Sequence, residues 1–514
     1  MTSLPVAAIL PELLAALEGA PQVLLTAPTG AGKSTWLPLQ FLTHKGIQGR
    51  IILLEPRRLA ARNVAQRLAE LLNEKPGETV GYRMRAQSCV GPQTRLEVVT
   101  EGVLTRMIQR DPELNGIGLV ILDEFHERSL QADLALALLL DVQQGLRDDL
   151  KLLIMSATLD NGKLQQRLPD APQVVSEGRA WPVERRYQSL PAQLRFDEAV
   201  AIATADLLRH ETGSLLLFLP GVGEILRVQE HLAARVADDV LLCPLYGALS
   251  LEAQRKAILP APRGMRKVVL ATNIAETSLT IEGIRLVVDS AQERVARYDV
   301  RTGLTRLITQ RVSQASMTQR AGRAGRLEPG VCVHLLAKEQ AERAAAQSEP
   351  EILQSDLSGL LLELLQWGCS DPAQLNWLDL PPSANVQAAR RLLQMLNALD
   401  GERLSATGQK MARLGNDPRL AAMLVSAGND SEKATAAKLA AILEEPPRAG
   451  NTDLSVAFSR QQPGWQQRSQ QLLKRLNGRG GEVDGTMLAP LLAQAFADRI
   501  ARRRGQEGRY QLAN

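Results

Sequence analysis

A glycine-bearing segment near the N-terminus has the residue types of a phosphate-binding loop. Residues 27–35 read Ala-Pro-Thr-Gly-Ala-Gly-Lys-Ser-Thr, after the apolar run 23–25 and before Trp36. Small residues let backbone N–H groups converge on an anion, and the start of a helix adds its positive end. Lys33 can reach the β- and γ-phosphates of a nucleotide, and the Ser34 hydroxyl suits Mg²⁺. The sequence therefore predicts a nucleotide site here, against the alternative of an ordinary turn.

The expected nucleotide contacts extend along most of this loop. They are Thr29, Gly30, Ala31, Gly32, Lys33, Ser34 and Thr35. The usual pattern begins with a glycine separated by four residues from the Gly-Lys pair, and Ala27 stands at that place.

Two acids end a later apolar run. Residues 119–122 read Leu-Val-Ile-Leu, and Asp123 and Glu124 follow them. A phosphate loop needs a metal-associated acid and a carboxylate for the attacking water. We therefore assign Asp123 to Mg²⁺ through water, together with Ser34 and Glu124, and we assign Glu124 to the attacking water. A core strand that simply ends in a polar loop is the alternative.

An arginine-rich segment lies far downstream. Residues 319–326 read Gln-Arg-Ala-Gly-Arg-Ala-Gly-Arg, and arginines three apart on one helix face project together. Guanidinium groups suit the charge on a transferring phosphoryl group, and the small spacers allow close approach. The alternative is a basic helix face in solvent. If this segment meets the phosphate loop, the site is complete only when two domains close on each other.

The elements that must position these groups form two series. Short apolar runs alternate with helical stretches, which predicts parallel sheets covered on both faces. The runs are 23–25, 51–54, 96–99, 119–122 and 152–155 and then, after Pro172, 215–219, 240–242, 268–270, 286–288 and 331–335. Residues 1–20 read as a leading helix, and from about residue 345 the runs give way to amphipathic helices at 353–366 and 387–399.

Composition narrows the class of protein. The 514 residues suggest about three to four domains. The net charge of +4 is too small to argue for nucleic acid by itself, so a basic surface must be local. A candidate patch near the C-terminus, with a solvated helix tail as its alternative, consists of Arg499, Arg502, Arg503, Arg504 and Arg509.

Cysteine usage and hydropathy indicate the compartment. The four cysteines are scattered, which argues against a zinc site or a disulfide framework and fits a reducing cytosol. Pro11 and Glu12 interrupt the N-terminal apolar run, so no signal peptide is expected. No uncharged stretch reaches the roughly 20 residues of a membrane span. We expect a soluble, cytoplasmic protein with no membrane partner.

Eight motifs, read together and in order, resemble those of the superfamily 2 helicases. They are residues 27–35, 56–58, 100–102, 123–126, 156–158, 217–221, 271–281 and 319–326. Within that superfamily the chain resembles the DEAH-box ATP-dependent RNA helicases, and most closely their bacterial HrpB-type group. In this superfamily, an alanine at the position of Ala27 is usual. The resemblance covers roughly residues 5–345 strongly and the remainder loosely.

The resemblance implies a fold. It predicts two tandem RecA-like parallel-sheet domains, 1–172 and 173–346, then a winged-helix unit, 347–415, and a ratchet-like helical bundle, 416–514. Relatives usually continue with an oligonucleotide-binding fold, of which only residues 509–512 would be present. We therefore expect a fragment of a longer protein.

The resemblance also implies roles in hydrolysis beside Lys33 and Glu124. Gln319 would position the lytic water, and Arg323 and Arg326 would be arginine fingers. Arg67 would stack on the base, so that ATP or another NTP would be accepted. The residues implied in relaying nucleotide state are His126, Ser156, Thr158 and Ser278.

Other motifs match segments that grip a sugar-phosphate backbone. The implied RNA contacts are Arg57, Arg58, Thr100, Gly102, Thr272 and Asn273. Such groups carry no sequence information, so binding should be sequence-tolerant and salt-sensitive. Residues 294–310 alternate like two strands around the tight turn 301–303. A hairpin at this place acts as a wedge in DEAH-box relatives; a plain surface hairpin is the alternative.

We expect an Mg²⁺- and ATP-dependent motor that moves 3′ to 5′ along single-stranded or partly duplex RNA. DNA is kept as an alternative substrate. One alternative is an RNA-stimulated NTPase that remodels RNA–protein complexes without unwinding. Another is an RNA-binding scaffold that has lost hydrolysis. The scaffold is disfavoured because the hydrolytic residues are intact. The sequence identifies no protein partner.

Overall fold

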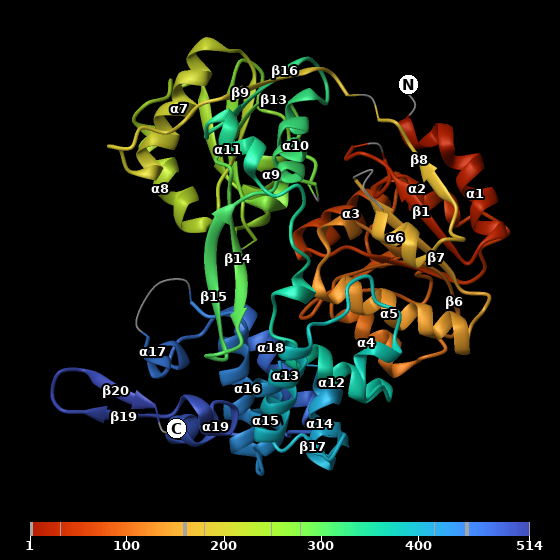
Figure 1. The fold of residues 1–514 in the computed structure, drawn as a ribbon, viewed down its shortest axis with the longest axis vertical. Coiled ribbons are helices and arrows are strands. Elements are labelled where there is room, and N and C mark those ends of the chain that lie inside the picture. Colours follow the sequence, from red (N-terminus) through yellow and green to blue (C-terminus); the bar gives the residue numbers. More distant parts are fainter. Residues whose placement is uncertain are drawn as a thin grey trace.

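The computed structural model describes residues 4–30, 32–157, 162–178, 180–247, 249–277, 279–415, 417–447 and 452–512. Two α/β domains lie side by side, and the C-terminal helices lie below both of them (Figure 1). The expectations for Ala31, Thr158 and Ser278 fall outside the described residues.

The first domain is built on one sheet, which has eight strands in the described part of the chain. All its pairings are parallel except β3 with β4. The strand order is β4 (Ser88–Cys89), β3 (Val80–Arg83), β5 (Leu96–Val99), β2 (Arg50–Leu54), β6 (Ile117–Leu122), β7 (Lys151–Ser156), β1 (Gln22–Thr26) and β8 (Gln173–Val175). All five strands predicted here are confirmed, and β8 extends this sheet past residue 172.

Helices cover both faces of this sheet because its buried residues alternate between them. Leu25 and Leu53 face one layer, whereas Leu24, Ile52 and Leu54 face the other. The first layer holds α1 (Leu10–Gly19), which follows the short helix η1 (Pro5–Ile9), α2 (Leu37–Phe41) and α3 (Arg58–Leu71). The second holds α4 (Val103–Arg110), α5 (Leu130–Gly145) and α6 (Gly162–Arg167).

The second domain has a fully parallel sheet, with six strands among the described residues. Their order is β11 (Val240–Pro244), β12 (Arg266–Ala271), β10 (Ser214–Phe218), β13 (Ile284–Asp289), β16 (Gly330–His334) and β9 (Val183–Tyr187). The five predicted strands are confirmed. Its helices are α7 (Phe196–His210), α8 (Val222–Ala233), α9 (Leu251–Ile258), α10 (Gln314–Gly322) and α11 (Lys338–Arg343).

Two residues of the first domain join an apolar cluster on one face of the second sheet. Leu59 and Ala60 of α3 belong to the same apolar cluster as Phe218 and Val287 of the second sheet. The two domains therefore share buried apolar surface.

A long antiparallel hairpin leaves the second domain. It consists of β14 (Gln292–Asp299) and β15 (Leu304–Arg311), and Gly303 takes φ 66° in the turn. Figure 1 shows it running down to the C-terminal helices. There, Arg499 Nη2 donates to the Gly303 carbonyl at 3.3 Å. The predicted hairpin is confirmed.

The C-terminal region is mainly helical. Its helices are α12 (Ser358–Trp367), α13 (Ser383–Met395), α14 (Ala406–Leu414), α15 (Pro418–Ser426), α16 (Asp430–Glu444), α17 (Leu454–Phe458), α18 (Pro463–Arg475) and α19 (Leu488–Ala495). A small hairpin of β17 (Leu399–Asp400) and β18 (Arg403–Leu404) separates α13 from α14. One apolar cluster joins Ile108 and Leu134 of the first domain to Leu361, Met423 and Ile442 of this region, which anchors it there.

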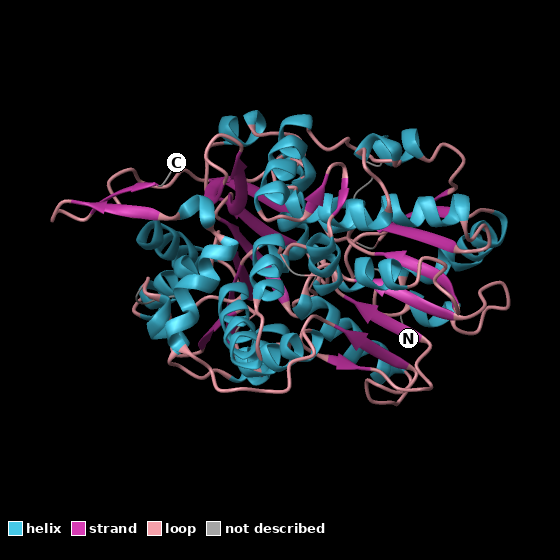
Figure 2. Ribbon diagram, turned by 90° about the horizontal axis from the view of Figure 1, so that it is seen from below, coloured by secondary structure: helices cyan, strands magenta, loops and turns pink. Residues whose placement is uncertain are grey.

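The arginine-rich end is a hairpin and not a helix tail. Strands β19 (Ala501–Arg504) and β20 (Arg509–Leu512) pair antiparallel and are exposed along their length. Figures 1 and 2 both show this hairpin projecting from the helices. Among the described residues, no helix combines the length and the apolar character that crossing a membrane requires.

Candidate active site

The loop after β1 holds Lys33 inside the first domain. Gly30 and Gly32 take φ values of 82° and 96°, a region that favours glycine. The N–H groups of Trp36 and Leu37 both donate to the Gly32 carbonyl, at 3.1 and 3.0 Å, and α2 begins at Leu37 as predicted. The turn buries Lys33, whose side chain is 3% exposed.

Two carboxylates meet Lys33 at the end of β6. Its Nζ lies 2.7 Å from Asp123 Oδ1 and 2.5 Å from Glu124 Oε1, and Ser34 Oγ donates to Asp123 Oδ2 at 2.5 Å. Burial alone would lower the pKa of Lys33, but the two carboxylates outweigh it and raise that pKa above its ordinary value. Burial opposes ionisation of Asp123, yet Lys33 holds the Asp123 pKa at about 2. Both groups are therefore charged at neutral pH.

Glu124 is held in an unusual conformation. Its φ is 54°, in the left-handed region, and it precedes the short helix η2 (Phe125–Glu127). His126 Nδ1 accepts a hydrogen bond from the Ala157 N–H at 3.2 Å, so the proton of a neutral ring is on Nε2, which lies 3.4 Å from Glu124 Oε2. Within the described structure, that Oε2 accepts no hydrogen bond. It is thus an acceptor for a water molecule.

Two arginines of the second domain reach this place. Arg326 follows the short helix η4 (Arg323–Gly325), and its Nη2 would lie 2.3 Å from a Cβ built on Gly30. Arg323 is 4% exposed, and its Nε donates to the Glu276 carbonyl at 2.7 Å. Its Nη1 and Nη2 are buried and donate no hydrogen bond to any described residue. Burial, and then the charge of Arg326, lower the pKa of Arg323 to about 9. Two guanidinium groups this close together suit an anion such as a phosphoryl group.

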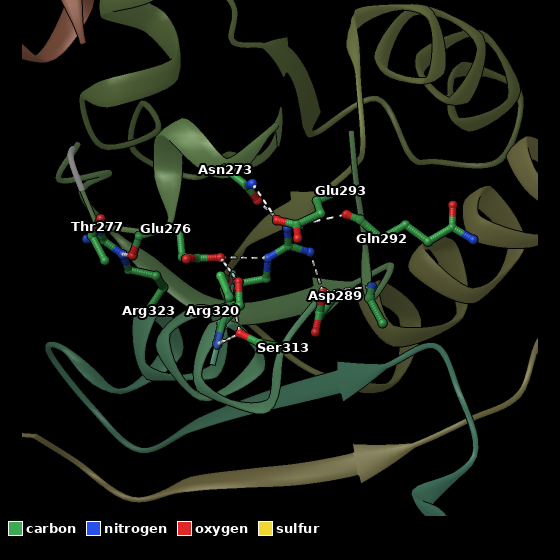
Figure 3. A network of polar contacts seen from close by, with 12 residues as sticks. Asn273, Glu276, Thr277, Asp289, Gln292, Glu293, Ser313, Arg320 and Arg323 are labelled. Atoms are coloured by element: carbon green, nitrogen blue, oxygen red, sulfur yellow. Dashed lines mark hydrogen bonds and ion pairs between the residues drawn. The ribbon is translucent and has the colours of Figure 1, made fainter. Parts of the chain in front are cut away.

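Arg320 does not join these two, so the prediction that three arginines project together is wrong. Helix α10 ends at Gly322 and tightens into η4, which turns Arg320 away from the other two. Its guanidinium is fully buried in the second domain, 2.7 Å from Asp289 Oδ1, 3.1 Å from Glu276 Oε1 and 4.9 Å from the centre of the Phe218 ring. Figure 3 shows it among these acids, with Arg323 on the far side of Glu276.

A cavity of about 560 Å³ lies between the domains beside this site. Gln319 lines it, together with His126 and the expected RNA contacts Arg57, Thr272 and Asn273. Ser156 is buried at the end of β7, directly before the Ala157 amide that contacts His126. Three of the six expected RNA contacts thereby line one cavity, Arg57 from the first domain and Thr272 and Asn273 from the second.

The other three expected RNA contacts lie outside the cavity lining. Arg58 is exposed, and its Nη1 lies 2.9 Å from Glu445 Oε1 of the helical region. Thr100 is buried, and Gly102, with φ 77°, precedes α4. Their roles stay predictions.

The remaining nucleotide contacts differ in exposure. Thr29 Oγ1 is buried and has no hydrogen-bond partner in the described part of the chain, and Thr35 is half-buried. Arg67 is exposed on α3, with Nη1 3.8 Å from Glu70 Oε2. An exposed guanidinium is free to stack on a base, and that role stays a prediction.

Sequence reasoning missed Glu55 and Glu127. Glu55 is 1% exposed at the end of β2, and burial followed by the charge of Asp123 raises its pKa well above the ordinary value. An acid directly after the apolar run 51–54 was the available signal. Glu127 accepts a hydrogen bond from Thr277 of the second domain, a contact that no spacing reveals.

The oxygen donors fit a magnesium ion. Ser34 Oγ and the Asp123 carboxylate are hard ligands in direct contact, Glu124 shares Lys33 with Asp123, and Glu124 Oε2 has no hydrogen-bond donor among the described residues. These residues would hold Mg²⁺, which would neutralise charge on the phosphates when bound.

The fold and this site define a class. Residues 7–166 match the family described as DEAD/DEAH box helicase, and residues 199–328 match the helicase conserved C-terminal domain. The chain belongs to the DEAD/DEAH box helicases, and its two sheets are RecA-like domains.

Particular relatives are very similar. The chain is 84% identical to the ATP-dependent RNA helicase HrpB of Escherichia coli (strain K12) over 514 residues, all of this chain and 64% of that protein. It is 35% identical to HrpA of the same organism over 437 residues, 83% of this chain and 33% of HrpA. A crystal structure of the E. coli DEAH/RHA helicase HrpB superposes with a TM-score of 0.97, covering 99% of this chain and 65% of that one.

Proposed function

We propose that the chain is an ATP-dependent motor on RNA, which hydrolyses Mg²⁺-ATP between its two RecA-like domains. The observation that carries this proposal is the position of Arg326 over Gly30, in the same loop that holds Lys33 against Asp123. Neither domain alone holds the complete set of charges. Two relatives, HrpB and HrpA, are described as ATP-dependent RNA helicases.

In the proposed reaction, the loop after β1 binds the phosphates and Lys33 contacts the β- and γ-phosphates. Glu124 orients the attacking water and accepts its proton, and Gln319 helps to place that water. Arg323 and Arg326 stabilise charge on the transferring phosphoryl group. Loss of the γ-phosphate removes what holds the arginines to the first domain, so that the domains can separate.

RNA would bind along the cavity between the domains. Arg57, Thr272 and Asn273 offer groups for phosphate and sugar, while the β14–β15 hairpin runs from the second domain to the helical region. From the DEAH-box resemblance we expect movement in the 3′-to-5′ direction, with the hairpin acting as a wedge.

The test is phosphate release by the parent chain and by Glu124→Gln, with and without poly(U). We expect poly(U) to stimulate the parent, and the variant to bind ATP while losing turnover. Glu97→Gln is the control, because Glu97 is equally buried in the same sheet but pairs with Arg50 and Arg83. Normal turnover in Glu124→Gln would contradict the assignment.

A second candidate is an RNA-stimulated NTPase that remodels complexes without unwinding. A change in the β14–β15 hairpin distinguishes an unwinding enzyme from this remodelling enzyme. Shortening the turn 301–303 should reduce strand separation more than RNA-stimulated hydrolysis if the hairpin is a wedge. Equal losses would favour the remodelling enzyme, and an absence of hydrolysis in the parent would favour a binding scaffold.

A further inference from the structure

One carboxylate contacts both domains at their boundary. Glu127, at the end of η2, accepts a hydrogen bond from Thr277 Oγ1 of the second domain at 3.1 Å. Its other oxygen lies 3.7 Å from Arg57 Nε in the first domain. Glu127 is one short turn along the chain from Glu124, so it stands between the hydrolytic site and the cavity.

Arg57 is oriented by charge. Its Nε is buried and donates no hydrogen bond to a described residue, and 3.7 Å exceeds hydrogen-bond length. The pKa of Arg57 is raised first by Glu127, against burial, with further contributions from Glu276, Glu101 and Glu124. Glu127 is therefore the carboxylate whose charge acts most strongly on Arg57, and their 3.7 Å separation leaves the guanidinium able to contact a phosphate.

The turn that carries Thr277 also holds an arginine of the hydrolytic site. Thr277 is 3% exposed, and the neighbouring Glu276 carbonyl accepts the hydrogen bond from Arg323 Nε at 2.7 Å. Figure 3 shows Thr277 and Arg323 together beside Glu276, whose side chain contacts Arg320 on its other side. Closure of the domains around a nucleotide therefore brings Arg323 to the phosphates and Thr277 to Glu127 in one movement.

We infer that Glu127 is a positioning residue that couples RNA binding to nucleotide binding. When the domains close, Thr277 fixes the Glu127 carboxylate, and Glu127 then fixes Arg57 at the cavity wall. This inference rests on the proposed function. Because coupling between two sites is reciprocal, the same contact must appear in the effect of RNA on nucleotide affinity.

The experiment measures the coupling directly. The dissociation constant of a labelled single-stranded oligoribonucleotide is measured with and without a non-hydrolysable ATP analogue and Mg²⁺. The ratio of the two constants is compared in the parent, in Thr277→Val and in Thr204→Val. Thr204 is the matched control, because it is buried in the same domain and donates only within α7, to the Val200 carbonyl at 2.8 Å.

We expect the ratio in Thr277→Val to fall about three- to tenfold toward one, which is about the net worth of one intramolecular hydrogen bond. The RNA dissociation constant without nucleotide should stay unchanged, and Thr204→Val should behave as the parent. Glu127→Gln should also lower the ratio, and the double variant should fall no further than the lower single variant, because both changes break one linkage.

An unchanged ratio in Thr277→Val would overturn the inference while leaving the proposed function intact. Equal weakening of RNA binding with and without nucleotide would also overturn it, because that is the signature of a structural defect. If the parent chain itself neither hydrolyses ATP nor binds RNA, the proposed function fails, and the inference fails with it.

Discussion

The guanidinium of Arg326 occupies the space above Gly30, across the boundary between the two α/β domains. A Cβ on Gly30 would lie 2.3 Å from Nη2 and 2.6 Å from Cζ of that arginine. A side chain at this position would therefore have to push the Arg326 guanidinium aside, in addition to adopting the left-handed conformation of the turn.

Gly30→Ala should therefore impair hydrolysis more than folding. The substitution strains the backbone, which has φ 82° at Gly30, and its methyl group displaces Arg326. A misplaced catalytic group lowers the rate of reaction by up to about 100-fold. Gly116→Ala is the matched control, since Gly116 has φ 79° and open space around its Cα. Both variants should lose about 1–3 kcal/mol of stability from backbone strain. Equal ATPase rates in the two variants would refute the steric argument.

Arg320→Ala should lower the free energy of unfolding of the second domain. The change takes the guanidinium charge away from the buried Asp289, which keeps its hydrogen-bond contact with His334 Nδ1, and removes the contact with Phe218. Breaking a buried ion pair costs about 3–5 kcal/mol. Arg227→Ala breaks an exposed pair with Asp197 in the same domain and should cost less than about 1 kcal/mol. Urea unfolding measures both, and similar losses would contradict a structural role for Arg320.

Glu363 should make stability depend on pH. Burial raises the pKa of Glu363 from 4.5 to about 7, although Gln109 Nε2 donates to its Oε2 at 3.0 Å. The folded state therefore binds the proton more tightly than the unfolded state. That contribution is full below about pH 4.5 and is lost as the pH rises through about 7.

Glu363→Gln stays neutral, so it should raise Tm relative to the parent at about pH 8 and leave it nearly unchanged at about pH 4. Thermal unfolding at the two pH values measures the difference. Glu230→Gln, at an exposed position of α8, should show no such difference. A gain of the same size at both pH values would mean that packing, and not ionisation, is responsible.

The central strands and the first-domain acids could be read from the sequence because their signals are local. An apolar run such as 119–122 followed by Asp123 specifies both a buried strand and a polar end. The edge strands β8 and β9 were not predicted. Strand β8 has only three residues, and β9, which reads Val-Glu-Arg-Arg-Tyr at 183–187, is polar. The prediction for Arg320 was wrong because evenly spaced arginines do not indicate where α10 ends and η4 begins. Glu127 with Thr277 depends on two segments that only the fold brings together.

Single-turnover hydrolysis by Arg326→Ala tests the central claim, that one nucleotide is held between two domains of this chain. Removing an arginine finger lowers such rates by about 10³–10⁵. We expect a loss of this order at saturating ATP, with unchanged stability and with RNA affinity close to that of the parent. A rate within about twofold of the parent would contradict the claim that Arg326 carries a charge of the second domain to the bound nucleotide.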